Sequence, residues 1–214
     1  NELALGGGFA LALPAHCRTV SAAAAGLGLP ECFLGIVPAW GGCKEMLIRH
    51  LPGPRDPKGP MPGVMAAFEQ ISLAKVSKSA AEAKEMKYLR QSDGVTMNRD
   101  RLLADAKALA LKLVAAGYKP PAPVELHLPG PTARAALGLA IDGFARQGLA
   151  LPHDVVVAGR LADVLSGGAT DMMDAVSEDQ ICDLEKAAFM ALIRTLPTLA
   201  RMEVMLSTGK PLRN

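Results

Sequence analysis

The sequence predicts an α/β unit at the N-terminal end of the chain, followed by a mainly α-helical C-terminal region. Three observations predict this fold class. The stretch 3–13, LALGGGFALAL, consists of an apolar run, a glycine cluster and a second apolar run, an order typical of strand, tight turn and helix. Beyond residue 64, apolar residues recur at helical spacing after helix-capping residues. Half of the 214 residues are hydrophobic but only 4% are aromatic, which favours closely packed helices.

The glycine cluster is the first candidate site. We expect a strand over residues 3–5 and a helix over 9–14. Glycines lack a Cβ and let the backbone approach a ligand closely, and the first N–H groups of a helix have no intrahelical partner. Such a loop holds negative charge, either a phosphate or an oxyanion that forms during a reaction. A third interpretation is a structural turn that lets the helix pack on its strand.

The rest of the first fifty residues predicts a second glycine turn and a further helix. Residues 38–42, PAWGG, form the turn, and residues 43–51 have helical character. Between the two glycine loops we expect, in order, β structure over 17–22, a short helix or turn over 22–25, an extended or turn segment over 27–31, and a strand or buried turn over 32–37.

Helix caps organise the second part of the chain. Ser79 and Asn98 are predicted N-caps, and Ser177 begins a capping box with Gln180. A short strand is predicted over 71–76. Helices are predicted over 79–88, 98–117, 132–147, 153–166, 177–196 and 198–206, of which 98–117 has a clear apolar stripe.

Two proline-rich stretches divide the chain. Residues 52–63 contain five prolines and three glycines, a composition that we expect to exclude regular structure. The predicted divisions are the N-terminal α/β unit over 1–51, a Pro/Gly loop over 52–63, a helical continuation over 64–118, a proline-rich linker over 119–131 and a helical C-terminal region over 132–214.

Composition excludes several classes of partner. The formal net charge is +2 and the charges are mixed along the chain, so no basic patch predicts a nucleic-acid partner. No apolar run reaches the roughly 18 residues of a membrane span, so we expect no membrane contact. The cysteines Cys17, Cys32, Cys43 and Cys182 have no metal-ligand or disulfide-framework spacing, which favours reduced thiols, no metal site and a cytoplasmic location.

The glycine cluster matches neither common phosphate-binding pattern. A dinucleotide-binding GxGxxG needs a third glycine where Leu11 stands. A P-loop needs Gly-Lys-Ser/Thr, which does not follow Gly8. The oxyanion interpretation is therefore favoured over the phosphate interpretation.

The order of these motifs resembles the crotonase (enoyl-CoA hydratase/isomerase) superfamily. The resemblance covers residues 1 to about 51 and implies that this region is the C-terminal half of a crotonase-like core. The fold class is then a truncated crotonase-like α/β segment followed by the helical region. The matching stretches are Ala4-Leu5-Gly6-Gly7-Gly8-Phe9, Leu29-Pro30-Glu31, Leu34-Gly35-Ile36-Val37-Pro38 and Gly41-Gly42.

The resemblance implies an acyl-CoA thioester as the substrate. Crotonases hold the thioester carbonyl with two backbone N–H groups, which stabilise the enolate as it forms. By position the Gly7 N–H is one of these donors, and the other belongs to an earlier part of the family's unit. Glu31 matches the family's second catalytic glutamate, and Gly8, Pro38 and Gly41 fall at substrate-binding positions.

Ala10 departs from the hydratase pattern. Hydratases of this family add water with two glutamates, and Ala10 stands where the first would be. An alanine methyl can neither hold nor deprotonate water. Three hypotheses stay open: a segment that is inactive by itself, an enoyl-CoA isomerase that uses Glu31 alone, and a non-catalytic structural or oligomerisation module. Glu31 could also be a solvated loop carboxylate, and His153 a solvated or capping residue.

Two later stretches resemble a narrower group, the bacterial 3-hydroxyacyl-CoA dehydrogenases of fatty-acid β-oxidation, in which an NAD-binding part precedes a crotonase-like part. The resemblance implies that this chain is the C-terminal end of such a protein and binds no cofactor itself, with NAD held by the missing upstream part. An absent first half would leave an apolar sheet face or edge uncovered, which predicts self-association or a homo-oligomer. The stretches are Met97-Asn98-Arg99-Asp100-Arg101-Leu102-Leu103 and Thr208-Gly209-Lys210-Pro211-Leu212-Arg213-Asn214.

Overall fold

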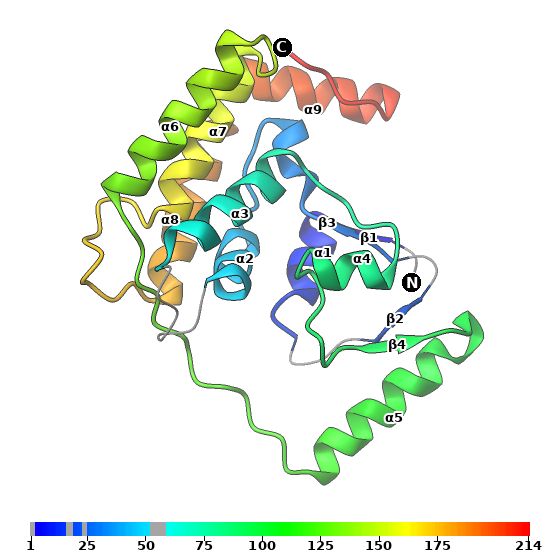
Figure 1. Cartoon of the computed structure of the whole chain (residues 1–214). Helices are drawn as coiled ribbons and strands as arrows, with labels where there is room; N and C mark the ends of the chain where they lie inside the picture. The colour runs from blue at the N-terminus through cyan, green and yellow to red at the C-terminus, as the bar shows by residue number, and fades with distance from the viewer. Residues whose placement is uncertain (1–2, 16–18, 23–24, 52–58) are drawn as a thin grey trace.

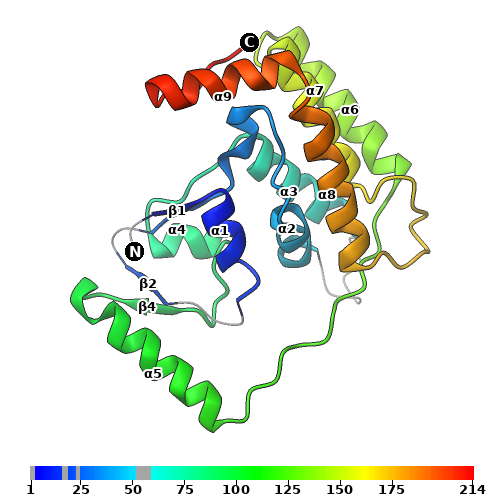
Figure 2. The same ribbon diagram turned by 180° about the vertical axis from the view of Figure 1, so that it is seen from behind.

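The chain folds into a small α/β part and a larger group of helices packed beside it (Figures 1 and 2). The structure is a computed structural model, and it describes residues 3–15, 19–22, 25–51 and 59–214. Figure 1 shows the strands together with α1 (Gly7–Ala12) and α4 (Ala80–Glu85) on one side of the molecule, α2 (Gly42–His50) and α3 (Met61–Ser72) in the middle, and α6 (Pro131–Arg146), α7 (Pro152–Leu165) and α8 (Glu178–Leu192) on the other side. Helices predominate, as predicted, but the strands are not confined to the start of the chain, because β4 (Gly94–Thr96) follows α2, α3 and α4.

Two parallel strand pairs form the sheet structure of the described residues. β1 (Leu3–Leu5) pairs with β3 (Gly26–Gly28), and β2 (Thr19–Ser21) pairs with β4 (Gly94–Thr96). The helix α1 (Gly7–Ala12) follows β1 directly. In a parallel pair, both strands deliver the chain to the same end of the sheet. The residues that follow β1 and β3 therefore lie together at one end.

Helices make up most of the remaining described chain. Their starts agree closely with the cap signals in the sequence, because Ser79 and Ser177 each accept a hydrogen bond from a first-turn N–H. The elements are η1 (Pro30–Leu34), α2 (Gly42–His50), α3 (Met61–Ser72), α4 (Ala80–Glu85), η2 (Arg99–Arg101), α5 (Leu102–Ala115), α6 (Pro131–Arg146), α7 (Pro152–Leu165), α8 (Glu178–Leu192) and α9 (Leu196–Thr208), where η denotes a 3-10 helix.

One continuous hydrophobic core joins the two parts. It runs from Phe9 and Leu29 in the α/β part, through Met46 and Ile71 of the middle helices, to Leu161 of α7. All five side chains are fully buried. At the α/β end, the ring of Phe9 packs edge-on against Tyr88, with centroids 5.0 Å apart. The loops that follow β1 and β3 are thus anchored on a shared core.

The structure corrects several local predictions. The segment 71–76 is not a strand, because α3 continues to Ser72 and only Val76 forms an isolated bridge, with Gly28. The predicted loop 52–63 ends early: α3 begins at Met61, since proline is tolerated in the first turn of a helix. Residues 52–58 lie outside the described residues, as do 17 and 18 of the predicted 17–22 strand.

The amphipathic helix predicted over 98–117 forms, as η2 followed by α5, but its apolar stripe is not buried. Asn98 caps η2, where its side chain accepts the Asp100 N–H. No residue of α5 is buried, and Leu103 and Val114 are 82% and 75% exposed. α5 extends away from the core and lies along β2 and β4 (Figure 2). The spacing therefore predicted the helix but not its partners.

No helix in the described part of the chain combines the length and the apolar character needed to cross a bilayer.

We expect Ser177→Ala to lower the free energy of unfolding by about 1 kcal/mol, because it removes the capping box of α8. Ser177 Oγ accepts the Gln180 N–H at 3.2 Å, and Gln180 Oε1 accepts the Ser177 N–H at 2.8 Å. Urea unfolding followed by circular dichroism measures the loss. Ser207→Ala is the matched control, since the exposed Ser207 hydroxyl only donates to a carbonyl of its own helix. Equal effects of the two substitutions would contradict the capping role.

Candidate functional site

Glu31 lies at the carboxyl end of the β1–β3 pair. It follows Pro30 in the one-turn helix η1, which Gly35 ends in the left-handed conformation at φ +77°. Leu29, just before η1, is fully buried and fixes the point at which this turn leaves the sheet. The sequence predicted an extended or turn segment over 27–31, and in the structure a short 3-10 helix begins at Pro30.

The parallel pairing of β1 and β3 brings the glycine loop to Glu31. The Gly6 N–H donates to the Gly28 carbonyl at 3.0 Å, which continues the pairing one residue past the end of β1. A Cβ built on Gly6 would lie 3.3 Å from Oε1 of Glu31. The Gly6 backbone has φ +54° and ψ −132°, a conformation that essentially only glycine adopts. The structure therefore places two of the predicted motifs, GGG and LPE, side by side.

The Glu31 side chain is partly buried, and one of its carboxyl oxygens is enclosed and unsatisfied. Oε2 has no accessible surface and accepts no hydrogen bond from the described residues. Burial raises the pKa of Glu31 to about 7, the nearby Glu185 carboxyl adds to the rise, and the residue's own backbone N–H opposes it. The interpretation of Glu31 as a solvated loop carboxylate is wrong. A carboxyl with this pKa exchanges protons readily near neutral pH.

Gly7 and Gly8 form the open side of the loop. Both are exposed, and a Cβ built on either would meet nothing within 4 Å. Their N–H groups precede the first hydrogen bonds of α1, which the Phe9 and Ala10 N–H groups make to the Gly6 carbonyl. The backbone N–H groups beside Glu31 are thus accessible to a ligand. The predicted role of Gly7 as an oxyanion donor remains a prediction.

The chain contains a second copy of the Gly6 conformation. Gly130 has φ +56° and ψ −135°, and it precedes Pro131, the first residue of α6. Gly6 likewise precedes Gly7, the first residue of α1. A proline is therefore compatible with the backbone at the position that Gly7 occupies.

Pro38 and Gly41 belong to the turn in front of α2. Pro38 is buried and its carbonyl accepts a hydrogen bond from the Cys43 thiol at 3.3 Å. Gly41 has φ +79°, and its N–H donates to Oε2 of Glu185 at 2.7 Å. The Gly41 N–H is thus already engaged by the protein. The predicted substrate contacts of Pro38 and Gly41 remain predictions.

Ala10 is buried, with 4% of its surface exposed. It lies on α1 next to the fully buried Phe9, so the position is filled by core packing. The described structure shows no carboxyl group at this position, in keeping with the sequence departure from the hydratase pattern.

The C-terminal helices hold the turn that carries Glu31. From α9, the Thr198 hydroxyl donates to the Gly35 carbonyl at 2.8 Å, and the Arg201 guanidinium donates to the Cys32 carbonyl at 3.3 Å. The imidazole Nε2 of His153 lies 2.8 Å from Thr198 Oγ1. His153 is therefore a buried partner of this contact rather than a solvated residue, which corrects the sequence prediction.

Arg201 is the most buried cation of this region, with 2% of its surface exposed. Its guanidinium pairs with Asp154 at 2.7 Å and also donates to the side chain of Asn214 at 2.8 Å. Burial acts to raise the pKa of Asp154, but hydrogen bonds from the Leu151 N–H and from the Arg201 and Arg213 side chains hold it below its ordinary value. Nothing in the sequence around Arg201 distinguished it from an ordinary surface cation.

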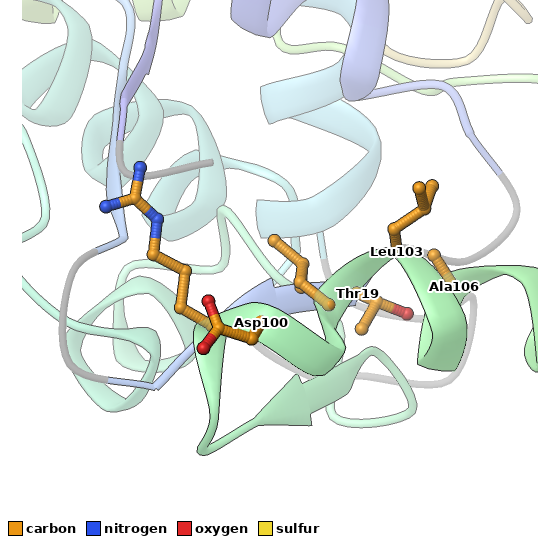
Figure 3. Close-up of a pocket in the computed structure, with 6 residues that line it drawn as sticks. Thr19, Asp100, Leu103 and Ala106 are labelled. Atoms are coloured by element: carbon orange, nitrogen blue, oxygen red, sulfur yellow. The ribbon is translucent and has the colours of Figure 1, made fainter.

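A separate hollow of about 370 Å³ lies between β2 and α5. Figure 3 shows Asp100 in η2, just before α5, with Leu103 and Ala106 along α5 and Thr19 beside them. No residue of the predicted site lines it. Among the described residues, no group of three or more His, Cys, Asp or Glu side chains is placed to hold a metal ion.

The chain is similar in sequence to parts of two longer proteins. It is 41% identical over 212 residues to a probable 3-hydroxyacyl-CoA dehydrogenase of Bacillus subtilis (strain 168), a match that covers 99% of this chain and 26% of that protein. A shorter match, 52% identical over 46 residues, covers 22% of this chain and 6% of a peroxisomal fatty acid beta-oxidation multifunctional protein of Arabidopsis thaliana. The chain thus spans about a quarter of the first relative. No family model matches the chain.

Solved structures of the crotonase fold resemble the chain. A carnitinyl-CoA hydratase from Mycobacterium avium superimposes with a TM-score of 0.54 at 16% identity, covering 98% of this chain and 59% of that one. A carnitinyl-CoA dehydratase from Mycobacterium avium 104 gives 0.53 at 19% identity, with 98% and 60% covered. These likenesses confirm the crotonase resemblance predicted from the sequence. At 16% and 19% identity they show a shared fold and say nothing about activity.

The buried carboxyls predict that stability falls as the pH rises from about 4.5 to 7. The pKa values of Glu31 and Glu185 are about 7 in the folded chain, above their ordinary value of 4.5, so the native state binds more protons than the unfolded state within this window. We expect Glu31→Gln to remove up to about 3 kcal/mol of this pH-dependent loss. Urea unfolding at a series of pH values measures it.

Glu203→Gln is the control for this measurement, because Glu203 is an exposed glutamate of α9. It should leave the slope of unfolding free energy against pH unchanged. A slope in Glu31→Gln equal to that of the unsubstituted chain would show that Glu31 is not held in a desolvated state.

Proposed function

We propose that this chain is the crotonase segment of a larger fatty-acid β-oxidation protein of the 3-hydroxyacyl-CoA dehydrogenase type, and that in the intact protein Glu31 is the proton carrier for isomerisation of an enoyl-CoA thioester. The first part is supported by the 41% identity to a relative about four times longer than this chain. The second part is supported by one observation: a buried carboxyl with an unsatisfied oxygen lies beside the open glycine loop.

Glu31 would move a proton between two carbons of the substrate. As a carboxylate it removes a proton from C2 of a 3-enoyl-CoA, the electrons move toward the thioester oxygen, and the double bond shifts. Protonated Glu31 then returns the proton to C4, which gives the 2-enoyl-CoA without net gain or loss of protons. Because the Glu31 pKa is about 7, both its protonated and its deprotonated forms are populated near neutral pH.

The Gly7 N–H would stabilise the negative charge on the thioester oxygen. Backbone donors directed at a developing oxyanion supply a large share of the catalysis in such reactions. Gly7 is exposed at the start of α1 and directly follows Gly6, on which a Cβ would lie 3.3 Å from Oε1 of Glu31. Gly8, Pro38 and Gly41 would line the substrate path, with Gly41 acting through the shape of its turn because its N–H is engaged by Glu185.

Hydration is the less favoured reaction. It requires a second carboxylate to hold the attacking water, and Ala10 occupies that position as a buried methyl group. Isomerisation needs one proton carrier and is compatible with Glu31 alone. The dehydrogenase activity and the NAD site belong, in this proposal, to the remainder of the larger protein.

Replacing Glu31 by Gln in the intact protein should lower kcat for 3-enoyl-CoA isomerisation by about 10²–10⁴-fold, the usual contribution of a general acid–base group. The dissociation constant for an acyl-CoA should change little, because Gln has nearly the same shape. Coupled spectrophotometric assays and calorimetry measure the two quantities. Glu203→Gln is the control, and an unchanged isomerisation rate in Glu31→Gln rules out the proposed chemistry.

The 214-residue chain by itself serves as the negative reference. We propose that it does not turn over substrate, because the family resemblance assigns the second oxyanion donor to an earlier part of the unit. Measurable hydratase activity of this chain alone would contradict both this proposal and the role given to Ala10.

A second variant distinguishes a catalytic site from a non-catalytic module. The non-catalytic module is the alternative that the alanine at position 10 favours, because a catalytic glutamate is missing there. Gly7→Pro removes the N–H donor, and the Gly130-Pro131 pair shows that this backbone accepts proline. We expect kcat/KM for isomerisation to fall by about 10²-fold or more, with a melting temperature close to that of the unsubstituted protein. Gly143→Ala, which adds a methyl group in open space on α6 and outside the proposed site, is the control. Equal acyl-CoA binding and turnover in Gly7→Pro would favour the non-catalytic module.

A further inference from the structure

Glu185 is a fully buried carboxylate that the proposed chemistry does not use. It lies on α8, and none of its surface is exposed. Oε2 accepts the Gly41 N–H and Oε1 accepts the Lys44 N–H, both at 2.7 Å. The acceptor and the donors are more than 140 residues apart in the sequence. One side chain from the C-terminal region thus satisfies two N–H groups at the start of α2.

The start of α2 depends on this contact. The N-cap residue of α2 is Gly41, which has no side chain, so no local cap satisfies the first N–H groups. A carboxylate at this end also interacts favourably with the helix dipole. Glu185 therefore takes the place of the missing cap and fixes the backbone between Gly41 and Lys44.

The turn that Glu185 fixes packs directly against the Glu31 loop. A Cβ on Gly42 would lie 2.6 Å from Cβ of Pro38 and 3.4 Å from the Leu29 side chain. Leu29 precedes η1, the turn that carries Glu31. Movement at the start of α2 would therefore be transmitted to Glu31 through close side-chain contacts.

Among the titratable neighbours of Glu31, Glu185 is the one whose charge changes near neutral pH. The titratable groups that interact with Glu31 are Glu185, Cys32, Cys43 and Tyr88, and burial raises the pKa of both cysteines and of Tyr88. These three groups are therefore neutral near pH 7, and Glu185 alone among the four changes its charge there.

Glu185 itself is surrounded by one cation and two thiols. Lys44 favours its charged form, but the Lys44 ammonium contacts Glu178 at 2.7 Å and Glu45 at 3.3 Å. Cys43 and Cys182 also interact with Glu185, and the pKa of each thiol is raised by burial. The charge of Glu185 is therefore only partly compensated by Lys44.

We propose that Glu185 is a positioning residue for the site: from α8 it holds the Gly41–Lys44 turn in place, and its carboxylate couples electrostatically to the Glu31 carboxyl, so that proton transfer at Glu31 depends on the charge of Glu185. This inference rests on the proposed function for its effect on catalysis. The coupling between the two carboxyls is independent of any reaction and can be measured without substrate.

The test compares Glu185→Gln with Asp183→Asn in the intact protein. Glu185→Gln removes the buried charge and keeps one acceptor oxygen, and Asp183→Asn removes the same charge from an exposed position of the same helix. Infrared spectra recorded against pH follow the carboxyl titration, and in Glu185→Gln the step that is absent from the double variant Glu31→Gln/Glu185→Gln belongs to Glu31. We expect Glu185→Gln to shift it downward by half a pH unit or more, an order of magnitude set by a like charge at close range. Asp183→Asn should not shift it.

The outcomes separate this inference from the proposed function. If the Glu31 titration is the same in Glu185→Gln and the unsubstituted protein, the coupling is overturned, whatever the enzyme activity. If the titration shifts but no isomerisation is detectable in the unsubstituted protein, the proposed function fails and the coupling stands. If both hold, the acidic limb of the pH profile of kcat/KM should move down with the infrared shift, which a merely structural role would not produce.

A reciprocal measurement covers the case in which Glu185→Gln does not fold. Coupling between two sites is mutual, so Glu31→Gln should lower the titration of the Glu185 carboxyl by the same amount. In the unsubstituted protein the pair should titrate in two steps, and in Glu31→Gln the remaining carboxyl should titrate in one step at lower pH than the upper of the two. If the single step in Glu31→Gln lies at the same pH as the upper step of the unsubstituted protein, the proposal is overturned.

Discussion

The parallel pairing of β1 and β3 is the constraint on which the site depends. Three residue pairs, Leu3 with Gly26 through Leu5 with Gly28, set the register, and the Gly6 N–H extends it by one hydrogen bond. Because parallel strands end at the same edge, the glycine loop and the Glu31 turn leave the sheet side by side. A shift of the pairing by one residue would turn the side chains of the shifted strand to the opposite face of the sheet. It would also move the two loops apart.

The helical part of the chain supports the Glu31 and Gly41 turns through buried polar contacts. Thr198 and Arg201 of α9 bind the carbonyls of the Glu31 turn, and Glu185 of α8 binds the N–H groups of the Gly41 turn. Such contacts are directional, whereas apolar packing tolerates small displacements. The carboxyl of Glu31 can remain buried with an unsatisfied oxygen because its surroundings are held in place from several sides.

The sequence predicted the parts of the site that depend on local chemistry. The glycine cluster, the proline before Glu31 and the Ser177 capping box follow from backbone preferences of single residues, and the structure shows a turn, a one-turn helix and a cap at these places. The burial of Glu31 was not predictable, because exposure of a carboxyl depends on what packs over it. Glu185 looked like any helical glutamate, since its partners lie more than 140 residues away. The exposed stripe of α5 shows the same limit, because helical spacing says nothing about the opposing layer.

The long-range contact of Glu185 has a consequence for how the molecule is made. A ribosome synthesises Gly41 and Lys44 well before it reaches α8, so the start of α2 emerges without its cap. Contacts of such high sequence separation form late because the loop between them must first be closed. The Gly41 turn can therefore settle only when the last helices have docked. Until then the Gly41 turn is not held in place, and the turn that carries Glu31, which packs against it through Leu29, lacks its final support.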